Sequence, residues 1–238
     1  PRPREMIRSM GALAFPTPVT IGPASAAARN VATSLASELG RLGIPSIVDE
    51  PGGAPATIWL ADGARSPRLG EEGYRLDVGR SRVTIVANTA AGLFYGAQTL
   101  EQLVLAHGRS DAAIPRVHIV DWPQYRWRGV HLDVSRHFFP VKIVERYIDL
   151  AARYKLNTFH WHLTDDQGFR VESKKLPKLH TLGSDGLFYT QDQVREIIAY
   201  ARDRGIRVMP EFDIPGHSTS WLVGYPEIGS APGPFKIE

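Results

Sequence analysis

The sequence RGVHLDVSRHFFPV, residues 128–141, decides the fold together with LNTFHWHLTDDQGF (156–169) and RGIRVMPEFDIPGH (204–217). Each piece is a short apolar run with alternation or β-branched residues, which predicts a strand, and each ends in polar residues. Parallel strands joined by helices send their carboxyl ends to one edge of a sheet, so the three polar clusters are expected to meet there. They form either one site or ordinary strand ends that are polar because they meet water.

Two helical segments separate these three strands. Pro140 suits the first turn of one helix, and Thr190 with Gln193 is a capping-box pattern that opens the other, which Gly205 ends. The alternation of strands and helices predicts a parallel α/β sheet, and polar residues at the strand ends favour a (β/α) barrel. We expect its first strands at 130–134, 156–163 and 206–209, with a long irregular excursion over 164–189.

The barrel predicted in this way is incomplete. A closed eight-stranded barrel takes about 250 residues, whereas fewer than half of the 238 residues follow Gln124. About three βα units are therefore expected, in a chain that is a piece of a longer barrel or in a sheet that stays open.

The first half of the chain predicts a separate small α+β unit. We expect a boundary near Trp122-Pro123-Gln124, which gives a non-catalytic domain over 1–123 and the amino-terminal part of a catalytic barrel over 124–238. No catalytic cluster is evident in the first unit. Its expected elements are helices at 24–42 and 89–106, a strand at 56–60, a hairpin of 73–78 with 82–87, and a strand at 114–120.

Composition narrows the function classes. Hydrophobic content of 43% with 22% charged residues is typical of a globular protein, and no apolar run is long enough to span a bilayer. A net charge of +3 without a Lys/Arg block argues against nucleic-acid binding, and the absence of cysteine excludes disulfides and thiolate chemistry. The chain starts Pro1-Arg2-Pro3, so we expect its true start upstream or removed, with secretion or a periplasmic location among the options.

The motifs SRHFFPV, HWHLTDDQGF and RVMPEFDIPGH, in this order and spacing, closely resemble the β-N-acetylhexosaminidases of glycoside hydrolase family 20. The upstream α+β unit also resembles the domain that precedes the barrel in that family. The resemblance implies hydrolysis of terminal N-acetylglucosamine or N-acetylgalactosamine from glycans or chitooligosaccharides, with no cofactor. It also implies substrate-assisted retention, in which the 2-acetamido carbonyl of the sugar attacks the anomeric carbon.

This chain departs from the family pattern at one point. In the family, a Glu protonates the leaving oxygen and the preceding Asp holds the acetamido group, within a His-x-Gly-Gly-Asp-Glu motif. The 238 residues contain no such motif. The expectation is that the intact protein is a hexosaminidase and that this piece alone is inactive.

The resemblance assigns roles to residues that are present. Arg136 corresponds to the arginine that binds hydroxyls of the terminal sugar, which its planar fork suits better than lysine would. Asp165 corresponds to a carboxylate that orients a histidine, and His217 to that histidine, which in the family contacts the acid Glu. These two are the predicted catalytic residues of this chain.

Other polar residues of the motifs receive supporting assignments. We expect Asp166 to give hydrogen bonds at the substrate site, and Glu211 with Asp213 to brace the loop that carries His217. His160 and His162 alternate with apolar neighbours and should face the barrel interior. Either can be a satisfied core histidine; we favour His162 as a wall of the substrate site.

Two alternatives remain open from the sequence. His160-x-His162 with Asp165 and His217 offers the ligand types of a catalytic zinc site, although Arg136 places a cation beside it. A non-catalytic carbohydrate-binding protein fits the missing acid.

Overall fold

The computed structural model describes residues 2–53, 56–107 and 113–237, and it divides into two compact units, 1–126 and 127–238. No helix in those described ranges has the length and apolarity needed to traverse a bilayer.

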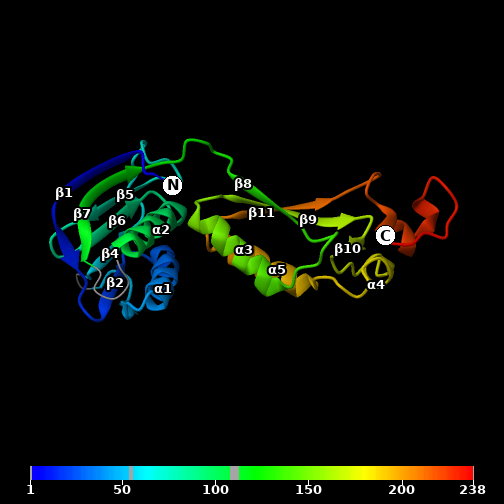
Figure 1. Ribbon diagram of the computed structural model, residues 1–238, viewed down its shortest axis with the longest axis horizontal. Helices are drawn as coiled ribbons and strands as arrows, with labels where there is room; N and C mark the ends of the chain where they lie inside the picture. The colour runs from blue at the N-terminus through cyan, green and yellow to red at the C-terminus, as the bar shows by residue number, and fades with distance from the viewer. Residues whose placement is uncertain (1, 54–55, 108–112, 238) are drawn as a thin grey trace. The chain divides into compact units, whose positions relative to one another are not determined.

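The first unit is a seven-stranded mixed sheet covered by two helices. The order of its strands is β1-β7-β5-β6-β4-β2-β3, and helices α1 and α2 pack against each other and on the sheet (Figure 1). The elements are β1 (Glu5–Ala14), β2 (Val19–Pro23), α1 (Ala26–Arg41), β3 (Ser46–Val48), β4 (Ile58–Ala61), β5 (Tyr74–Val78), β6 (Val83–Ala87), α2 (Ala90–His107) and β7 (Ala113–Asp121).

The expected hairpin is confirmed, because β5 and β6 pair antiparallel from Tyr74 with Ala87 to Val78 with Val83. Both expected helices are confirmed as well. Strand β1 is an addition, and it pairs with β7 at the edge of the sheet. Seven consecutive residues among the ten of β1 are exposed, so β1 has no alternation of buried and exposed side chains that could have predicted it.

The second unit contains the three expected parallel strands. Strand β9 lies between β8 and β11 and is parallel to both, while the short β10 pairs antiparallel with the end of β9. The elements are β8 (Gly129–Asp133), α3 (Val141–Arg153), β9 (Thr158–Asp165), β10 (Gly168–Phe169), α4 (Lys178–Leu182), α5 (Gln191–Arg202), β11 (Arg207–Phe212) and α6 (Thr219–Gly224), followed by a short 3-10 turn (Pro226–Ile228).

The two faces of β9 have different chemistry. Phe159, Trp161 and Leu163 are at most 1% exposed, and they alternate with His160 and His162, which lie on the opposite face. Helices α3 and α5 contact each other and lie along one face of the sheet (Figure 1). The second unit therefore has an apolar helix-covered face and a histidine-bearing face.

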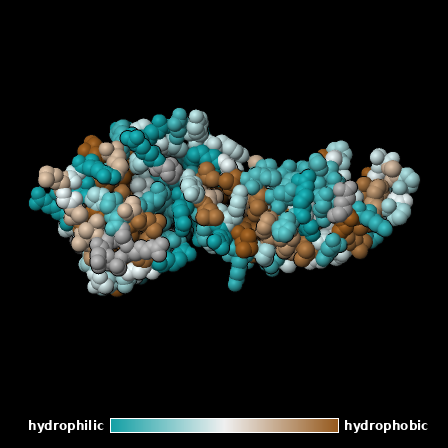
Figure 2. All heavy atoms as spheres, viewed as in Figure 1, coloured by the Kyte–Doolittle hydropathy of each residue, from teal (hydrophilic) through white to brown (hydrophobic). Residues whose placement is uncertain are grey.

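The excursion over 164–189 is more ordered than expected, because it contains β10 and α4. The capping box at the start of α5 is present, with the Thr190 hydroxyl accepting from the backbone of Gln193 and the Gln193 side chain accepting from the backbone of Thr190. In the view of Figure 2, hydrophilic and hydrophobic residues are interspersed over the second unit. The exposed large apolar side chains of this unit include Ile143 and Ile198.

Candidate active site

The strand register brings three ionisable side chains to one level of the sheet. Asp133 of β8 pairs with His162 of β9, and His162 pairs with Glu211 of β11. Residues in register on parallel strands project from the same face. The carboxyl ends of the three strands thus place a carboxylate, an imidazole and a second carboxylate side by side.

The turn after β8 holds Arg136. The Asp133 carboxylate accepts hydrogen bonds from the backbone N–H groups of Ser135 (2.9 Å) and Arg136 (3.0 Å) and from Nη1 of Arg136 (2.7 Å). Burial alone would raise the pKa of Asp133, but the hydrogen bonds from Arg136 outweigh it and hold that pKa below its usual range. The charged form of Asp133 fixes the arginine, whose side chain is 45% exposed and can reach a ligand.

Asp165 is the centre of the site. Its side chain is 1% exposed, its Oδ2 lies 2.6 Å from Nη2 of Arg136, and its Oδ1 lies 3.1 Å from Nδ1 of His217. His217 has a left-handed backbone conformation (φ 54°), which is uncommon for a residue with a side chain. The structure therefore brings together the three residues that the sequence analysis placed on one rim.

The Asp166 side chain binds the start of α6, which follows the loop that carries His217. Its Oδ1 accepts from the backbone N–H of Thr219 (3.0 Å) and from the Thr219 hydroxyl (2.7 Å). These hydrogen bonds hold the pKa of Asp166 below its ordinary value. Asp166 thereby ties the end of β9 to the first residue of α6, two positions after His217.

Glu211 and Asp213 occupy the end of β11. Oε2 of Glu211 lies 2.6 Å from Nδ1 of His162 and 2.7 Å from Nε2 of His160. Burial alone would raise the pKa of Glu211, but the hydrogen bond with His162 lowers it below the usual value. The backbone N–H of Asp213 donates to the Thr164 hydroxyl at 3.0 Å, which joins β11 to β9.

Arg170 supports the turn that carries Arg136, and it was not identified from the sequence. It is 5% exposed, and its guanidinium donates to the carbonyl of Ser135 through Nη2 (2.7 Å) and to the carbonyl of Ser184 through Nη1 (2.6 Å). Ser135 directly precedes Arg136, so Arg170 connects the turn after β8 to the excursion. A single Arg after a strand offers no periodic signal that could have predicted this role.

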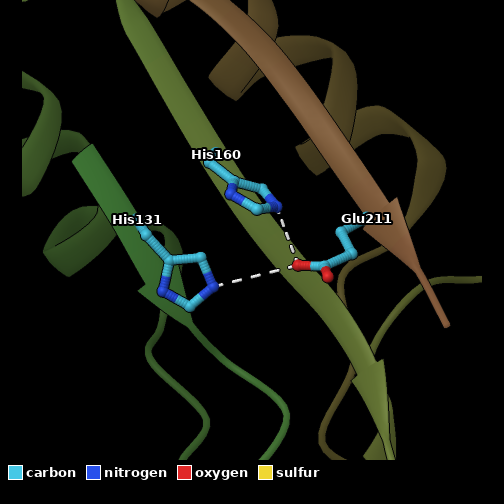
Figure 3. Close-up of side chains that lie close together, drawn as sticks. All are labelled: His131, His160 and Glu211. Carbon is cyan, nitrogen blue, oxygen red and sulfur yellow. Dashed lines mark ion pairs between the residues drawn. The ribbon is translucent and has the colours of Figure 1, made fainter. Parts of the chain in front are cut away.

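The histidine-bearing face also offers ligand types for a metal. Ligand atoms of His131, His160 and Glu211 lie within 4.8 Å of one another, and both imidazoles point toward the carboxylate (Figure 3). Two imidazoles and a carboxylate suit zinc, yet Oε2 of Glu211 is already held by His162. A cation bound at that oxygen would have to displace this hydrogen bond.

A second group, His162 with Asp165 and Asp213, and a third, Asp165 with Asp166 and His217, have ligand atoms equally close. Both include Asp165, which carries the Arg136 guanidinium at 2.6 Å. A metal at either group would place two cations against one carboxylate, as anticipated for the zinc alternative.

Both units of the chain match domains of one protein family. Residues 125–236 match the catalytic domain of glycosyl hydrolase family 20, and residues 1–122 match domain 2 of that family. The β-hexosaminidase of Vibrio furnissii is 38% identical over 95% of this chain and 39% of its own length, and the β-N-acetylhexosaminidase of Cellulomonas fimi is 40% identical over 78% of this chain and 39% of its own length.

Solved structures are similar over nearly the whole chain. An N-acetyl-β-hexosaminidase of Streptomyces plicatus, in complex with Thio-NAglucal, superposes with a TM-score of 0.90 at 38% identity. The β-N-acetylhexosaminidase of Streptomyces coelicolor gives 0.88 at 37% identity. Each match covers 99% of this chain and 50% of the other, so the chain spans about half of these structures.

These matches confirm the predicted fold class, an α+β domain followed by part of a family 20 barrel. On the agreement of both domains, their order and the strand-end motifs, this chain belongs to glycosyl hydrolase family 20.

Proposed function

We propose that the protein, in its full length with any residues that precede or follow 1–238, hydrolyses terminal β-linked N-acetylhexosamine residues. One observation carries the proposal: the buried Asp165 carboxylate contacts Arg136 through one oxygen and His217 through the other. Such an arrangement joins a group that can bind sugar hydroxyls to an imidazole that can act on a neighbouring acid.

Arg136 is the proposed sugar-binding residue. Its guanidinium is fixed by Asp133 and Asp165, and the side chain as a whole remains 45% exposed. A planar cation held in this way can donate parallel hydrogen bonds to vicinal hydroxyls of a terminal sugar. Solved relatives with N-acetylglucosamine bound, such as the exo-β-N-acetylglucosaminidase of Vibrio harveyi, support an N-acetylated sugar as the ligand.

His217 and Asp165 are the proposed catalytic pair. Asp165 holds the His217 ring by a hydrogen bond at Nδ1, and this hydrogen bond also sets the direction of Nε2. In the proposed reaction the acetamido oxygen of the substrate forms a bond to the anomeric carbon while the glycosidic oxygen leaves with a proton. Water then opens the cyclic intermediate with retention.

The residue that protonates the leaving oxygen is not part of the three motifs identified in this chain. The resemblance assigns it to a His-x-Gly-Gly-Asp-Glu motif, which residues 1–238 do not contain. The role proposed for His217 is to contact that acid. Asp166 is proposed to hold the His217 loop through Thr219 at the edge of the substrate site.

A comparison of three substrates and two variants tests the proposal. The full-length protein should release nitrophenol from the β-N-acetylglucosaminide or β-N-acetylgalactosaminide, and far more slowly from the β-glucoside, which has a 2-hydroxyl. Arg136→Lys should lower kcat/KM about 10- to 100-fold, because a charged hydrogen bond is worth about 1.5–3 kcal/mol. Arg195→Lys is the control, since Arg195 on α5 has a 64% exposed side chain.

Each outcome has a defined meaning. Equal rates on the acetamido and hydroxyl sugars would exclude substrate assistance. Unchanged kinetics of Arg136→Lys would remove the sugar-binding role. Binding of N-acetylglucosamine without turnover of any substrate would instead support the carbohydrate-binding alternative.

A further inference from the structure

His162 is a buried imidazole between two carboxylates. Its side chain is 5% exposed, its Nδ1 lies 2.6 Å from Oε2 of Glu211, and its Nε2 lies 2.9 Å from Oδ2 of Asp165. Both ring nitrogens are thus within hydrogen-bond distance of carboxylate oxygens. A ring used in this way has no nitrogen left to bind a sugar, which argues against its expected place in the wall of the substrate site.

The two contacts favour the doubly protonated ring. A neutral imidazole carries one N–H, so it can donate to only one of two carboxylates, whereas the imidazolium donates to both. Burial alone would lower the pKa of His162, but the hydrogen bonds to Glu211 and Asp165 outweigh it and raise that pKa above its usual value. A competing arrangement is a neutral ring whose Nε2 accepts from Nη1 of Arg136 at 3.4 Å.

The charges around the ring also favour a cation. Carboxylates approach from the three parallel strands, with Asp133 on β8, Asp165 on β9, and Glu211 and Asp213 at the end of β11. Arg136 is one cation against them. Three other imidazoles lie around this cluster: His131, at 5.7 Å between ring centroids, His160, which contacts Glu211, and His217, which contacts Asp165. A charged His162 reduces the repulsion among these carboxylates.

We propose that Glu211 and a protonated His162 are positioning residues that hold Oδ2 of Asp165, so that Oδ1 is directed at His217. This inference rests on the proposed function, because Asp165 and His217 matter only if they serve the reaction. Oδ2 of Asp165 has two cationic neighbours, Arg136 at 2.6 Å and His162 at 2.9 Å. These two contacts on Oδ2, together with the backbone N–H of Asp166 that donates to Oδ1 at 2.7 Å, prevent the carboxylate from rotating, and Oδ1 then has one direction.

Glu211 is the residue to change, because it touches His162 and does not belong to the proposed catalytic pair. Glu211→Gln keeps the volume and removes the charge that favours the imidazolium. His160→Gln is the matched control, since His160 also contacts Oε2 of Glu211, at 2.7 Å, but has no contact with Asp165 among the described hydrogen bonds and ion pairs.

The first measurement is independent of activity. In protein labelled with ¹⁵N-histidine, the two ring signals of His162, assigned by their loss in His162→Gln, should both have imidazolium shifts at a pH where an exposed histidine is neutral. Glu211→Gln should move this titration to lower pH, and His160→Gln should move it less. Neutral-ring shifts for His162 in the wild-type protein would overturn the inference without any variant.

The second measurement is kinetic, on the full-length protein with the nitrophenyl β-N-acetylglucosaminide. Glu211→Gln should lower kcat about 10- to 100-fold, the size of effect that misplacement of a reacting group produces. KM should change little, and the alkaline limb of the kcat profile should move to lower pH. Unchanged kcat in a folded Glu211→Gln protein with a displaced His162 titration would overturn the positioning role. If the wild-type protein hydrolyses no N-acetylhexosaminide, the proposed function fails, while the ¹⁵N measurement still decides the charge of His162.

Discussion

Replacing Arg170 by methionine should destabilise the second unit more than any change at an exposed arginine. The guanidinium donates to carbonyl oxygens of Ser135 (2.7 and 3.2 Å), Ser184 (2.6 Å), Leu187 (3.2 Å) and Gln167 (3.1 Å). Methionine retains an apolar chain in place of the aliphatic part of the arginine and has no donor. The variant would leave these acceptors without their partner.

The magnitude follows from burial. Ser135 is 0% exposed, so water does not replace the lost donor at its carbonyl oxygen without opening the structure. The carbonyl of Ser184, which is also 0% exposed, keeps a hydrogen bond from the backbone N–H of Leu187 at 3.0 Å. A buried acceptor left unsatisfied costs about 1–3 kcal/mol, and relief of the desolvation that lowers the pKa of Arg170 offsets part of this cost. We expect a loss of about 1–3 kcal/mol.

The assay should report on the second unit alone, because a chain of two units does not guarantee a single unfolding transition. Native-state hydrogen exchange, read by mass spectrometry on peptides covering 158–190, gives the free energy of opening there. Peptides from β5 and β6 should be unchanged. Arg195→Met is the control: the side chain is 64% exposed and pairs with Asp192, so its loss should cost under about 0.5 kcal/mol.

An equal effect of Arg170→Met and Arg195→Met would refute the reasoning, because it would mean that the buried carbonyls find other partners.

Three further predictions concern the same unit. Gly168→Ala should destabilise it by about 1–3 kcal/mol, because an added Cβ would lie 2.2 Å from Cζ of Arg170; urea unfolding monitored on this unit checks the value, and no loss would show that the guanidinium can move away. Thr190→Ala should cost about 1 kcal/mol through loss of the cap on α5, with Thr190→Ser restoring most of the stability in the same titration. Hydrogen bonds from Thr219 lower the pKa of Asp166, so the contribution of Asp166 to the free energy of unfolding is fully present above its unfolded pKa and is lost as pH falls through the lower folded value. Asp166→Asn should therefore reduce the loss of stability at acid pH. An unchanged dependence of stability on acid pH would contradict the assignment.

Much of this molecule could be predicted locally. The alternation of Phe159 and Trp161 with polar neighbours indicated a strand with two different faces, and both are buried on the face expected to be apolar. The capping pattern at Thr190 located the start of α5. Each of these signals depends on residues a few positions apart, and that is why the sequence alone was sufficient. The parallel order of β8, β9 and β11 then follows from strands separated by helices.

The tertiary structure decided which polar groups meet. The sequence predicted Arg136, Asp165 and His217 at one rim, but it could not show that the buried Asp165 carboxylate joins the other two. It favoured His162 as a wall of the substrate site and left a satisfied core histidine open, and in the structure the ring lies between Glu211 and Asp165. Those contacts depend on the register of three strands that are distant in sequence. Side-chain hydrogen bonds extend over only about 3 Å. The periodicity of a sequence does not specify positions to that distance, whereas the packing of the whole unit does.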